Sequence, residues 1–169
     1  MIIKKKLFRN VYLLSNKTFK DARGKFLKFD NVLAINKKKI NFNQYCYSSN
    51  KNKFTLRGLH FQKYPYEEIK LITCIQGKIF DVVVDIKKKS KTYLQWKCVE
   101  LNENDALSLF IGKGYAHGFL TLKKNTVVLY NISGPYKRNF QRIVNWKDPK
   151  IGIIWPARPR LISKTDKQI

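Results

Sequence analysis

Strand-length stretches of apolar and β-branched residues follow one another along this chain, with only short polar turns between them. The clearest stretches are residues 69–75, 78–86, 96–101, 106–111, 119–122 and 126–132. Such runs favour β-strands, and connections this short leave little room for helices. Only residues 31–35 fit a modest helix. We therefore expect an all-β fold, either a sandwich or a barrel, with little helix.

Weaker patterns of the same kind extend the expected strands toward the N-terminus. Residues 11–14 fit an opening strand, residues 21–24 a turn, and residues 41–48 a half-buried strand. Gln76-Gly77 separates two β-rich runs and predicts a hairpin, although Gln-Gly is a weaker turn signal than Asn-Gly. From about residue 134 the pattern breaks, and we expect an irregular C-terminal tail.

The size of the chain fits one domain that spans residues 1–169, and no linker or repeat divides it. No apolar run approaches the roughly 20 residues that a membrane span needs, and no signal peptide is evident. The three cysteines are odd in number and form no Cys-x-x-Cys motif. We therefore expect reduced thiols, a cytoplasmic location and no membrane association.

A net charge of +24 raises the question of nucleic-acid binding, because such an excess attracts polyanions. However, 28 of the 35 basic residues are lysines, and they are spread along the chain in short groups. No helix-turn-helix pattern, zinc spacing or aromatic RNA-binding motif accompanies them. We interpret the lysines as solvated turns and faces, and we expect no nucleic-acid partner.

The two histidines of the chain each lie in a short motif that contains glycine. His60 belongs to Leu-Arg-Gly-Leu-His-Phe-Gln, and His117 belongs to Gly-Lys-Gly-Tyr-Ala-His-Gly-Phe. In a strand that alternates sides, His60 and Gln62 project to one face and Arg57 to the other. Arg57 reaches the same face as His60 only if the backbone bends at Gly58.

These residue types favour proton transfer over metal chemistry. Two histidines with few carboxylates do not supply the three or more ligands of a typical zinc or iron site. Histidine is a natural general base near neutral pH, provided that an acceptor, commonly a carboxylate, orients its second nitrogen. Tyr115, Tyr130 and Tyr136 are candidate proton donors, and lysine or arginine suits an anionic ligand. The spacing of the residues does not identify the orienting carboxylate.

Several motifs occur in an order that is typical of one enzyme family. They are Arg57-Gly-Leu-His-Phe-Gln62, Lys70-Leu71, Gly77-Lys-Ile-Phe-Asp-Val-Val-Val-Asp-Ile86, Ser90-Lys-Thr92, Gly114-Tyr-Ala-His-Gly-Phe119, Tyr130, Trp146-Lys-Asp-Pro149, Ile151-Gly-Ile-Ile-Trp-Pro156 and Ser163-Lys-Thr-Asp166. Together they resemble the dTDP-4-dehydrorhamnose 3,5-epimerase family across essentially the whole chain. The resemblance implies a cupin-type double-stranded β-helix (jelly roll) that forms a homodimer and uses no metal or organic cofactor.

The resemblance also implies a reaction and roles for its residues. A nucleotide-linked 4-keto-6-deoxyhexose loses a proton from C3 or C5 to a base, and an acid on the other face returns a proton to the enolate. By position, His60 is the expected base, Asp166 its orienting carboxylate, Tyr130 the acid and Lys70 the group that stabilises the enolate. The expected substrate-binding residues are Arg23, Arg57 and His117, with Phe26, Gln44 and Tyr136 lining the sugar-nucleotide site, Tyr136 by stacking.

The chain departs from the family pattern in groups that recognise the substrate. Lys28 stands where the family usually has glutamate, Cys46 where it has asparagine, and residues 110–112 replace a Trp-x-Pro stretch. A change from acceptor to donor can alter the preferred nucleotide or sugar. The alternatives are therefore an epimerase of one carbon only, an epimerase of another nucleotide sugar, a non-catalytic sugar-nucleotide-binding cupin, and a basic nucleic-acid-binding barrel.

Overall fold

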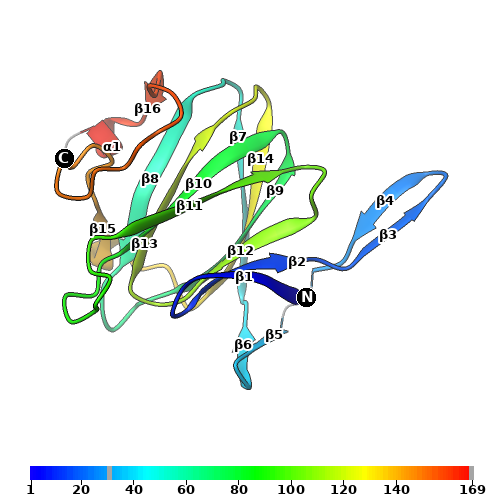
Figure 1. The fold of residues 1–169 in the computed structure, drawn as a ribbon, viewed down its shortest axis with the longest axis horizontal. Coiled ribbons are helices and arrows are strands. Elements are labelled where there is room, and N and C mark those ends of the chain that lie inside the picture. The colour runs from blue at the N-terminus through cyan, green and yellow to red at the C-terminus, as the bar shows by residue number, and fades with distance from the viewer. Residues whose placement is uncertain (30–31, 168–169) are drawn as a thin grey trace.

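The computed structural model describes residues 1–29 and 32–167, and two antiparallel sheets packed face to face form its body (Figure 1). The first sheet has the order β1 (Ile2–Phe8), β2 (Val11–Ser15), β12 (Leu107–Ile111), β9 (Ile69–Gln76), β14 (Thr126–Ser133) and β7 (Gln44–Asn50). The second has the order β11 (Trp96–Asn102), β10 (Lys78–Asp85), β13 (Tyr115–Thr121), β8 (Thr55–Gln62) and β15 (Gln141–Ile143). The expectation of an all-β sandwich is confirmed.

Apolar side chains from the inner faces of both sheets form the main core. Ile72 and Cys74 of β9 meet Ile79 and Val83 of β10 in this cluster, and all four are almost fully buried. This arrangement corrects the hairpin expected around Gln76-Gly77. The strands β9 and β10 belong to opposite sheets, so the chain crosses the core at this turn instead of pairing the two strands.

A short helix was expected at residues 31–35. Asn31 lies outside the described residues, and for residues 32–35 the expectation is wrong. Val32–Ile35 forms β5, which pairs with β6 (Lys38–Asn41) in a small hairpin. Leu33 and Ile35 alternate with exposed neighbours and pack on the outer face of the first sheet. This period of two belongs to a strand, but four residues are too few to distinguish it from a helical turn.

The other N-terminal elements agree in part with those expected from the sequence. The opening strand is confirmed as β2, and the expected turn at 21–24 joins β3 (Thr18–Asp21) to β4 (Gly24–Leu27). The half-buried strand expected at 41–48 is shifted to β7, residues 44–50. The strand β1 was missed because its lysines obscure the pattern, and lysines are common on the edge strands of sheets.

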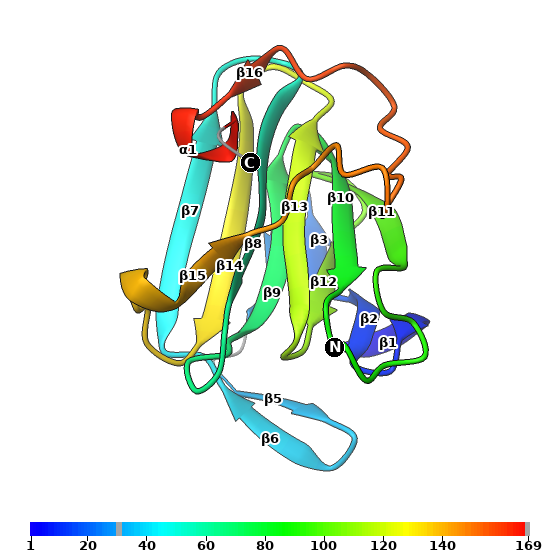
Figure 2. The same cartoon turned by 90° about the vertical axis from the view of Figure 1, so that its left-hand side faces the viewer.

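The C-terminal tail is mostly irregular, as expected, and it returns across the second sheet (Figure 2). It contains a 3-10 helix, η1 (Arg138–Phe140), the short strand β16 (Leu161–Ile162) and a final turn of helix, α1 (Lys164–Lys167). Because β16 pairs with the beginning of β8, the tail is fixed beside that strand. No helix in the described part of the chain has the length and hydropathy needed to cross a membrane.

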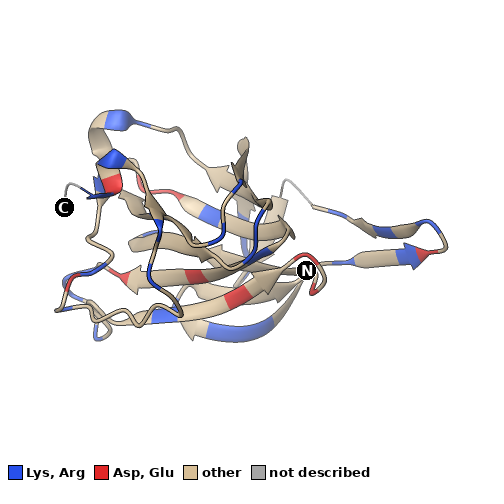
Figure 3. Ribbon diagram, turned by 90° about the horizontal axis from the view of Figure 1, so that it is seen from above, with Lys and Arg blue, Asp and Glu red and all other residues tan. Residues whose placement is uncertain are grey.

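Basic residues are distributed over strands and loops of the molecule (Figure 3). This distribution agrees with the interpretation of the lysines as solvated faces and turns.

Gly77→Ala is expected to destabilise the fold by about 1–3 kcal/mol. Gly77 has φ +79°, and an added Cβ would overlap the Thr126 hydroxyl and lie 3.0 Å from the Thr126 Cα. Urea unfolding measures the loss. Gly134→Ala is the matched control, because Gly134 has a similar φ of +86° but no atom within 4 Å of an added Cβ. Equal losses in the two variants would show that the contact with Thr126 does not matter.

Candidate active site

Two glycines, one from each histidine motif, meet where β8 pairs with β13 in the second sheet. A Cβ added to Gly58 would lie 2.6 Å from the Cα of Gly118, and one added to Gly118 would lie 3.0 Å from the Cα of Gly58. Neither position therefore accepts a side chain without separating the strands. The glycines are required because the two backbones touch.

The same strand pair contains a β-bulge that reorients Arg57. His60 pairs with His117 and Arg57 with Phe119, so two residues of β8 lie opposite the single residue Gly118 of β13. A bulge of this kind shifts the alternation of side chains by one position. Arg57 and His60 consequently line the same pocket, as expected for a backbone that bends at Gly58.

This pocket has a volume of about 480 Å³ and opens between the two sheets. The strand β8 supplies Arg57 and His60, whereas Tyr130 enters from β14 of the other sheet. The C-terminal tail closes one side. The lining residues are Ser48, Thr55, Leu56, Arg57, His60, Tyr130, Leu161, Ile162, Ser163 and Asp166.

His60 is held by the carboxylate of Asp166. The distance from His60 Nε2 to Asp166 Oδ1 is 2.7 Å, and the other carboxylate oxygen accepts the Gly58 amide at 3.3 Å. The Ser163 hydroxyl oxygen accepts the Asp166 amide and fixes the turn that carries the carboxylate. Burial alone would raise the pKa of Asp166, but the hydrogen bond and charge of His60, with the Gly58 amide, outweigh it and lower this pKa. The side chain of His60 remains 33% exposed and accessible from the pocket.

Tyr130 lies in the same pocket on the opposite sheet. Burial, and after it the negative charge of Asp81, raise the pKa of the Tyr130 phenol well above its ordinary value of 10.0. The phenol is therefore protonated at neutral pH. The pocket thus holds a carboxylate-oriented histidine and a protonated tyrosine on facing walls, an arrangement suited to general base and general acid chemistry.

His117 lies behind Tyr130 and is not among the residues that line the pocket. Its ring meets that of Tyr130 edge to face, with 6.2 Å between the centroids. Its Nε2 is 2.6 Å from Oδ1 of Asp81, and both side chains are buried. Burial raises the pKa of Asp81, and its second carboxylate oxygen has no hydrogen-bond partner among the described residues.

Two further basic side chains are fixed by neighbours on the chain. Lys70 is almost buried, pairs with Glu68 at 2.8 Å and donates to the carbonyl of His60 at 3.3 Å. Arg57 donates from Nε to the side-chain oxygen of Asn50 at 2.7 Å. Lys70 therefore lies beside the strand of the histidine but does not line the pocket.

Arg23 and Phe26 lie away from this pocket. They belong to the β3–β4 hairpin, which projects from the body of the molecule (Figure 1). The Arg23 side chain is 90% exposed and pairs with Asp21 on the same hairpin. A single chain therefore does not bring these two expected binding residues to His60.

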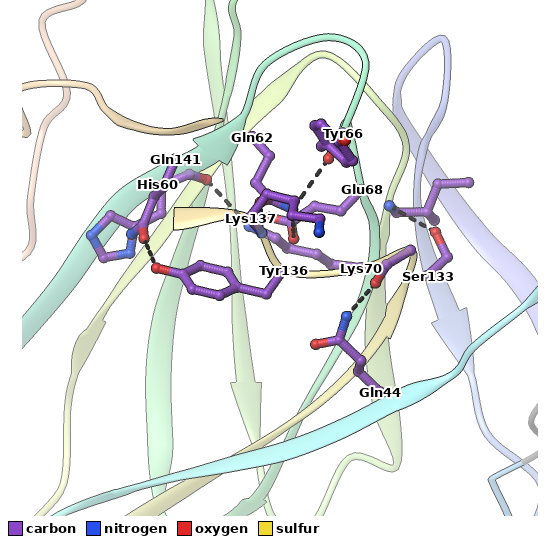
Figure 4. A network of polar contacts seen from close by, with 12 residues as sticks. Gln44, His60, Gln62, Tyr66, Glu68, Lys70, Ser133, Tyr136, Lys137 and Gln141 are labelled. Carbon is purple, nitrogen blue, oxygen red and sulfur yellow. Dashed lines mark hydrogen bonds and ion pairs between the residues drawn. The ribbon is translucent and has the colours of Figure 1, made fainter. Parts of the chain in front are cut away.

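Tyr136 lies on the segment that joins β14 to β15, and Gln44, the first residue of β7, contacts that segment (Figure 4). The Gln44 amide donates to the Gly134 carbonyl, and the Tyr136 hydroxyl donates to the side-chain oxygen of Gln141. The Tyr136 side chain is largely exposed. Both residues are near the end of β8 that carries His60 and Gln62, outside the residues that line the pocket.

Three supporting residues were missed by the sequence reasoning. Asp81 had a signal, because a carboxylate in the apolar strand β10 needs a partner. Glu68 lies two residues before Lys70, and only the structure reveals that they pair. Asn50, which holds Arg57, had no distinguishing signal. No group of three histidine, cysteine, aspartate or glutamate side chains able to hold a metal ion occurs within residues 1–29 and 32–167.

Comparisons with known proteins identify the family of the chain. The family model of dTDP-4-dehydrorhamnose 3,5-epimerase matches residues 5–169. The epimerase of Salmonella typhimurium is 38% identical over 159 residues, which cover 92% of this chain and 86% of that enzyme. The epimerase of Sinorhizobium fredii is 45% identical over a shorter stretch of 102 residues, which is 60% of this chain and 52% of that enzyme.

A solved structure shares the fold closely. The crystal structure of dTDP-4-dehydrorhamnose 3,5-epimerase from Bacillus anthracis, with TDP and PPi bound, superposes with a TM-score of 0.90 at 34% identity. The match covers 99% of this chain and 97% of that one. The likeness confirms the expected cupin-type jelly roll.

Asp166→Asn is expected to lower stability at pH 7, with a deficit that disappears in acid. The lowered pKa of Asp166 means that its carboxylate stabilises the folded state above the ordinary value of 3.8. This contribution is lost as the pH falls through the lower, folded-state value. Urea midpoints of both proteins between pH 7 and pH 3 measure it. A difference that does not change with pH would contradict the assignment.

Proposed function

The chain belongs to the dTDP-4-dehydrorhamnose 3,5-epimerase family, and we propose that it inverts C3 and C5 of dTDP-4-dehydro-6-deoxy-D-glucose to give dTDP-4-dehydro-L-rhamnose. The observation that carries this proposal is that a base and an acid face each other across one pocket. His60 with Asp166 lies on one sheet, Tyr130 lies on the other, and both line one pocket. The proposed reaction moves only protons, so it needs no redox cofactor.

The proton transfers follow from this arrangement. The 4-keto group acidifies the hydrogens on C3 and C5. Since Asp166 accepts the proton on Nε2 of His60, the lone pair is on Nδ1, which takes the proton from the sugar carbon. The electron pair of the broken C–H bond forms the enolate, and Tyr130 then donates its proton from the opposite face. Configuration inverts because removal and return occur on different faces.

Positive groups around the pocket support the binding of an anion. Arg57 lines the pocket and is held by Asn50 in a fixed position, which suits a diphosphate oxygen. The family resemblance assigns Lys70 to the enolate oxygen, and the contacts of its Nζ with Glu68 and the His60 carbonyl hold it beside the proposed base, just outside the residues that line the pocket. In this proposal the ring of His117, on the side of Tyr130 away from the pocket, orients Tyr130 by their edge-to-face contact.

A homodimer completes the proposed site. Arg23 and Phe26 lie on a projecting hairpin, and Phe26 is 65% exposed, as expected for a surface that another chain covers. A two-stranded hairpin alone is also marginally stable in water. We propose that each hairpin delivers Arg23 and Phe26 to the pocket of the partner subunit. A cytoplasmic location is part of the proposal, supported by the three cysteines, which are all free.

Proton NMR in deuterated water tests the reaction. With dTDP-4-keto-6-deoxyglucose, the wild-type protein is expected to introduce deuterium at both C3 and C5. His60→Ala is expected to lower exchange by at least about 10³-fold, because it removes the base, while dTDP binding measured by calorimetry persists. Deuterium at one carbon would indicate an epimerase of that carbon only.

Tyr130→Phe separates the acid from the base in the same assay. This variant is expected to retain deuterium exchange on the original face but to form the inverted product far more slowly, because the phenolic proton is absent. Full epimerisation by Tyr130→Phe would contradict the role of Tyr130 as acid. No exchange by a wild-type protein that binds dTDP would favour a non-catalytic sugar-nucleotide-binding protein.

Mixed dimers test the hairpin exchange. Arg23→Ala and His60→Ala are each expected to be nearly inactive alone. After the two are mixed and allowed to exchange subunits, a dimer with one of each contains one intact site, made from His60 of one chain and Arg23 of the other. Random pairing restores roughly a quarter of the wild-type activity. No recovery in mixed dimers verified by mass spectrometry would place Arg23 in the site of its own chain or outside both.

A further inference from the structure

Tyr136 and the two residues beside it are held at three points, although Tyr136 is 56% exposed. Their segment joins β14 to β15, and it has no regular structure before η1. The carbonyl of Pro135, the amide of Lys137 and the hydroxyl of Tyr136 each have a side-chain partner. Exposed connections of this kind are generally more mobile than the strands they join.

Gln62 supplies the two backbone anchors. Its Nε2 donates to the Pro135 carbonyl at 3.1 Å, and its Oε1 accepts the Lys137 amide at 2.6 Å. These two groups flank Tyr136 on both sides. Gln62 itself is 4% exposed, so it is a fixed part of the body and not a surface contact.

Glu68 and the carbonyls of Tyr66 and Pro135 together determine which way the Gln62 amide faces, because all three accept from its Nε2. Oε2 of Glu68 accepts a hydrogen bond from Nε2 of Gln62 at 3.2 Å, while the other carboxylate oxygen pairs with Lys70 (Figure 4). An amide turned the other way would place its oxygen against this carboxylate and its NH₂ against the Lys137 amide. The observed orientation is therefore the only one that satisfies both neighbours.

Gln141 supplies the third anchor, and it is the cross-strand neighbour of Gln62. The strands β8 and β15 place Gln141 opposite Gln62 and Ile143 opposite His60. The backbone and the phenol of Tyr136 are thus attached to two adjacent positions of one strand pair. The strand β8 also carries His60, so the tyrosine is fixed relative to the proposed base.

We propose that Gln62 and Gln141 are positioning residues that preset Tyr136 as a stacking platform for the nucleobase. The inference rests on the proposed function and on the stacking role that the family resemblance implies for Tyr136. An exposed tyrosine free to change rotamer would have to be ordered when the ligand binds, which reduces affinity. A ring already held by its hydroxyl and by both flanking peptide groups avoids this loss.

A double-mutant cycle on dTDP binding tests the proposal. Tyr136→Phe keeps the ring but removes the donor, and Gln141→Ala removes the acceptor. Each variant is expected to weaken dTDP binding by about three- to tenfold in calorimetry, and the double variant is expected to be no weaker than either single one. Losses that multiply in the double variant, or no loss in either single variant, would overturn the positioning role.

Further variants separate positioning from general damage. Gln141→Glu keeps an acceptor for the phenol and is expected to retain more affinity than Gln141→Ala. With Gln141→Ala, KM for the sugar nucleotide should rise while kcat changes by less than about twofold, because the proton-transfer groups are untouched. Gln62→Met, which removes the two backbone anchors, is likewise expected to raise KM with little change in kcat. Gln76→Ala, an exposed glutamine at the end of β9, is the matched control.

The outcome also distinguishes this inference from the proposed function. If the wild-type protein exchanges protons but the losses multiply, only the positioning role fails. If the wild-type protein binds dTDP and the cycle is non-additive, yet no deuterium enters the sugar, the positioning role is supported and the epimerase proposal fails.

Discussion

The site depends on one constraint, the contact of two glycine backbones where β8 pairs with β13. Gly58 and Gly118 touch there, and the bulge beside them shifts the side-chain alternation of β8. Without this shift, Arg57 would face away from the pocket of His60. The distance between the two backbones is too small for any Cβ. The two glycines that permit this close pairing therefore also direct Arg57 and His60 to one side of β8.

Scarce carboxylates are concentrated where the chemistry requires them. The chain has 11 acidic residues against 35 basic ones, yet His60, His117 and Lys70 each have a buried or nearly buried carboxylate partner. The carboxylate of each pair is largely shielded from water, and an unpaired charge in such a place would be costly. The interior of the site is therefore locally balanced within a strongly basic protein. Most of the excess positive charge lies on the surface.

The sequence predicted strands better than it predicted their partners. Runs such as 126–132 were found because their composition is local information. The turn at Gln76-Gly77 was misread as a hairpin, since nothing in the sequence distinguishes a turn within a sheet from a crossing between sheets. Likewise the pairing of His60 with Asp166 joins residues 106 positions apart. The resemblance to a family predicted it, whereas spacing alone left the carboxylate open.

Apart from Arg57, which lines the pocket, the proposed recognition groups lie in other parts of the fold than the proton-transfer groups. His60, Asp166 and Tyr130 line a pocket built on the two sheets, whereas the proposed binding residues Arg23, Phe26 and Tyr136 lie on a hairpin and a connecting segment outside it. The departures from the family pattern follow the same division. Lys28 follows the β3–β4 hairpin directly, and Cys46 lies on the edge strand β7, opposite Tyr130. Substitutions at such peripheral positions change the groups that meet a nucleotide or sugar while the base, its carboxylate and the acid stay in place. A change of substrate preference is therefore compatible with an unchanged reaction.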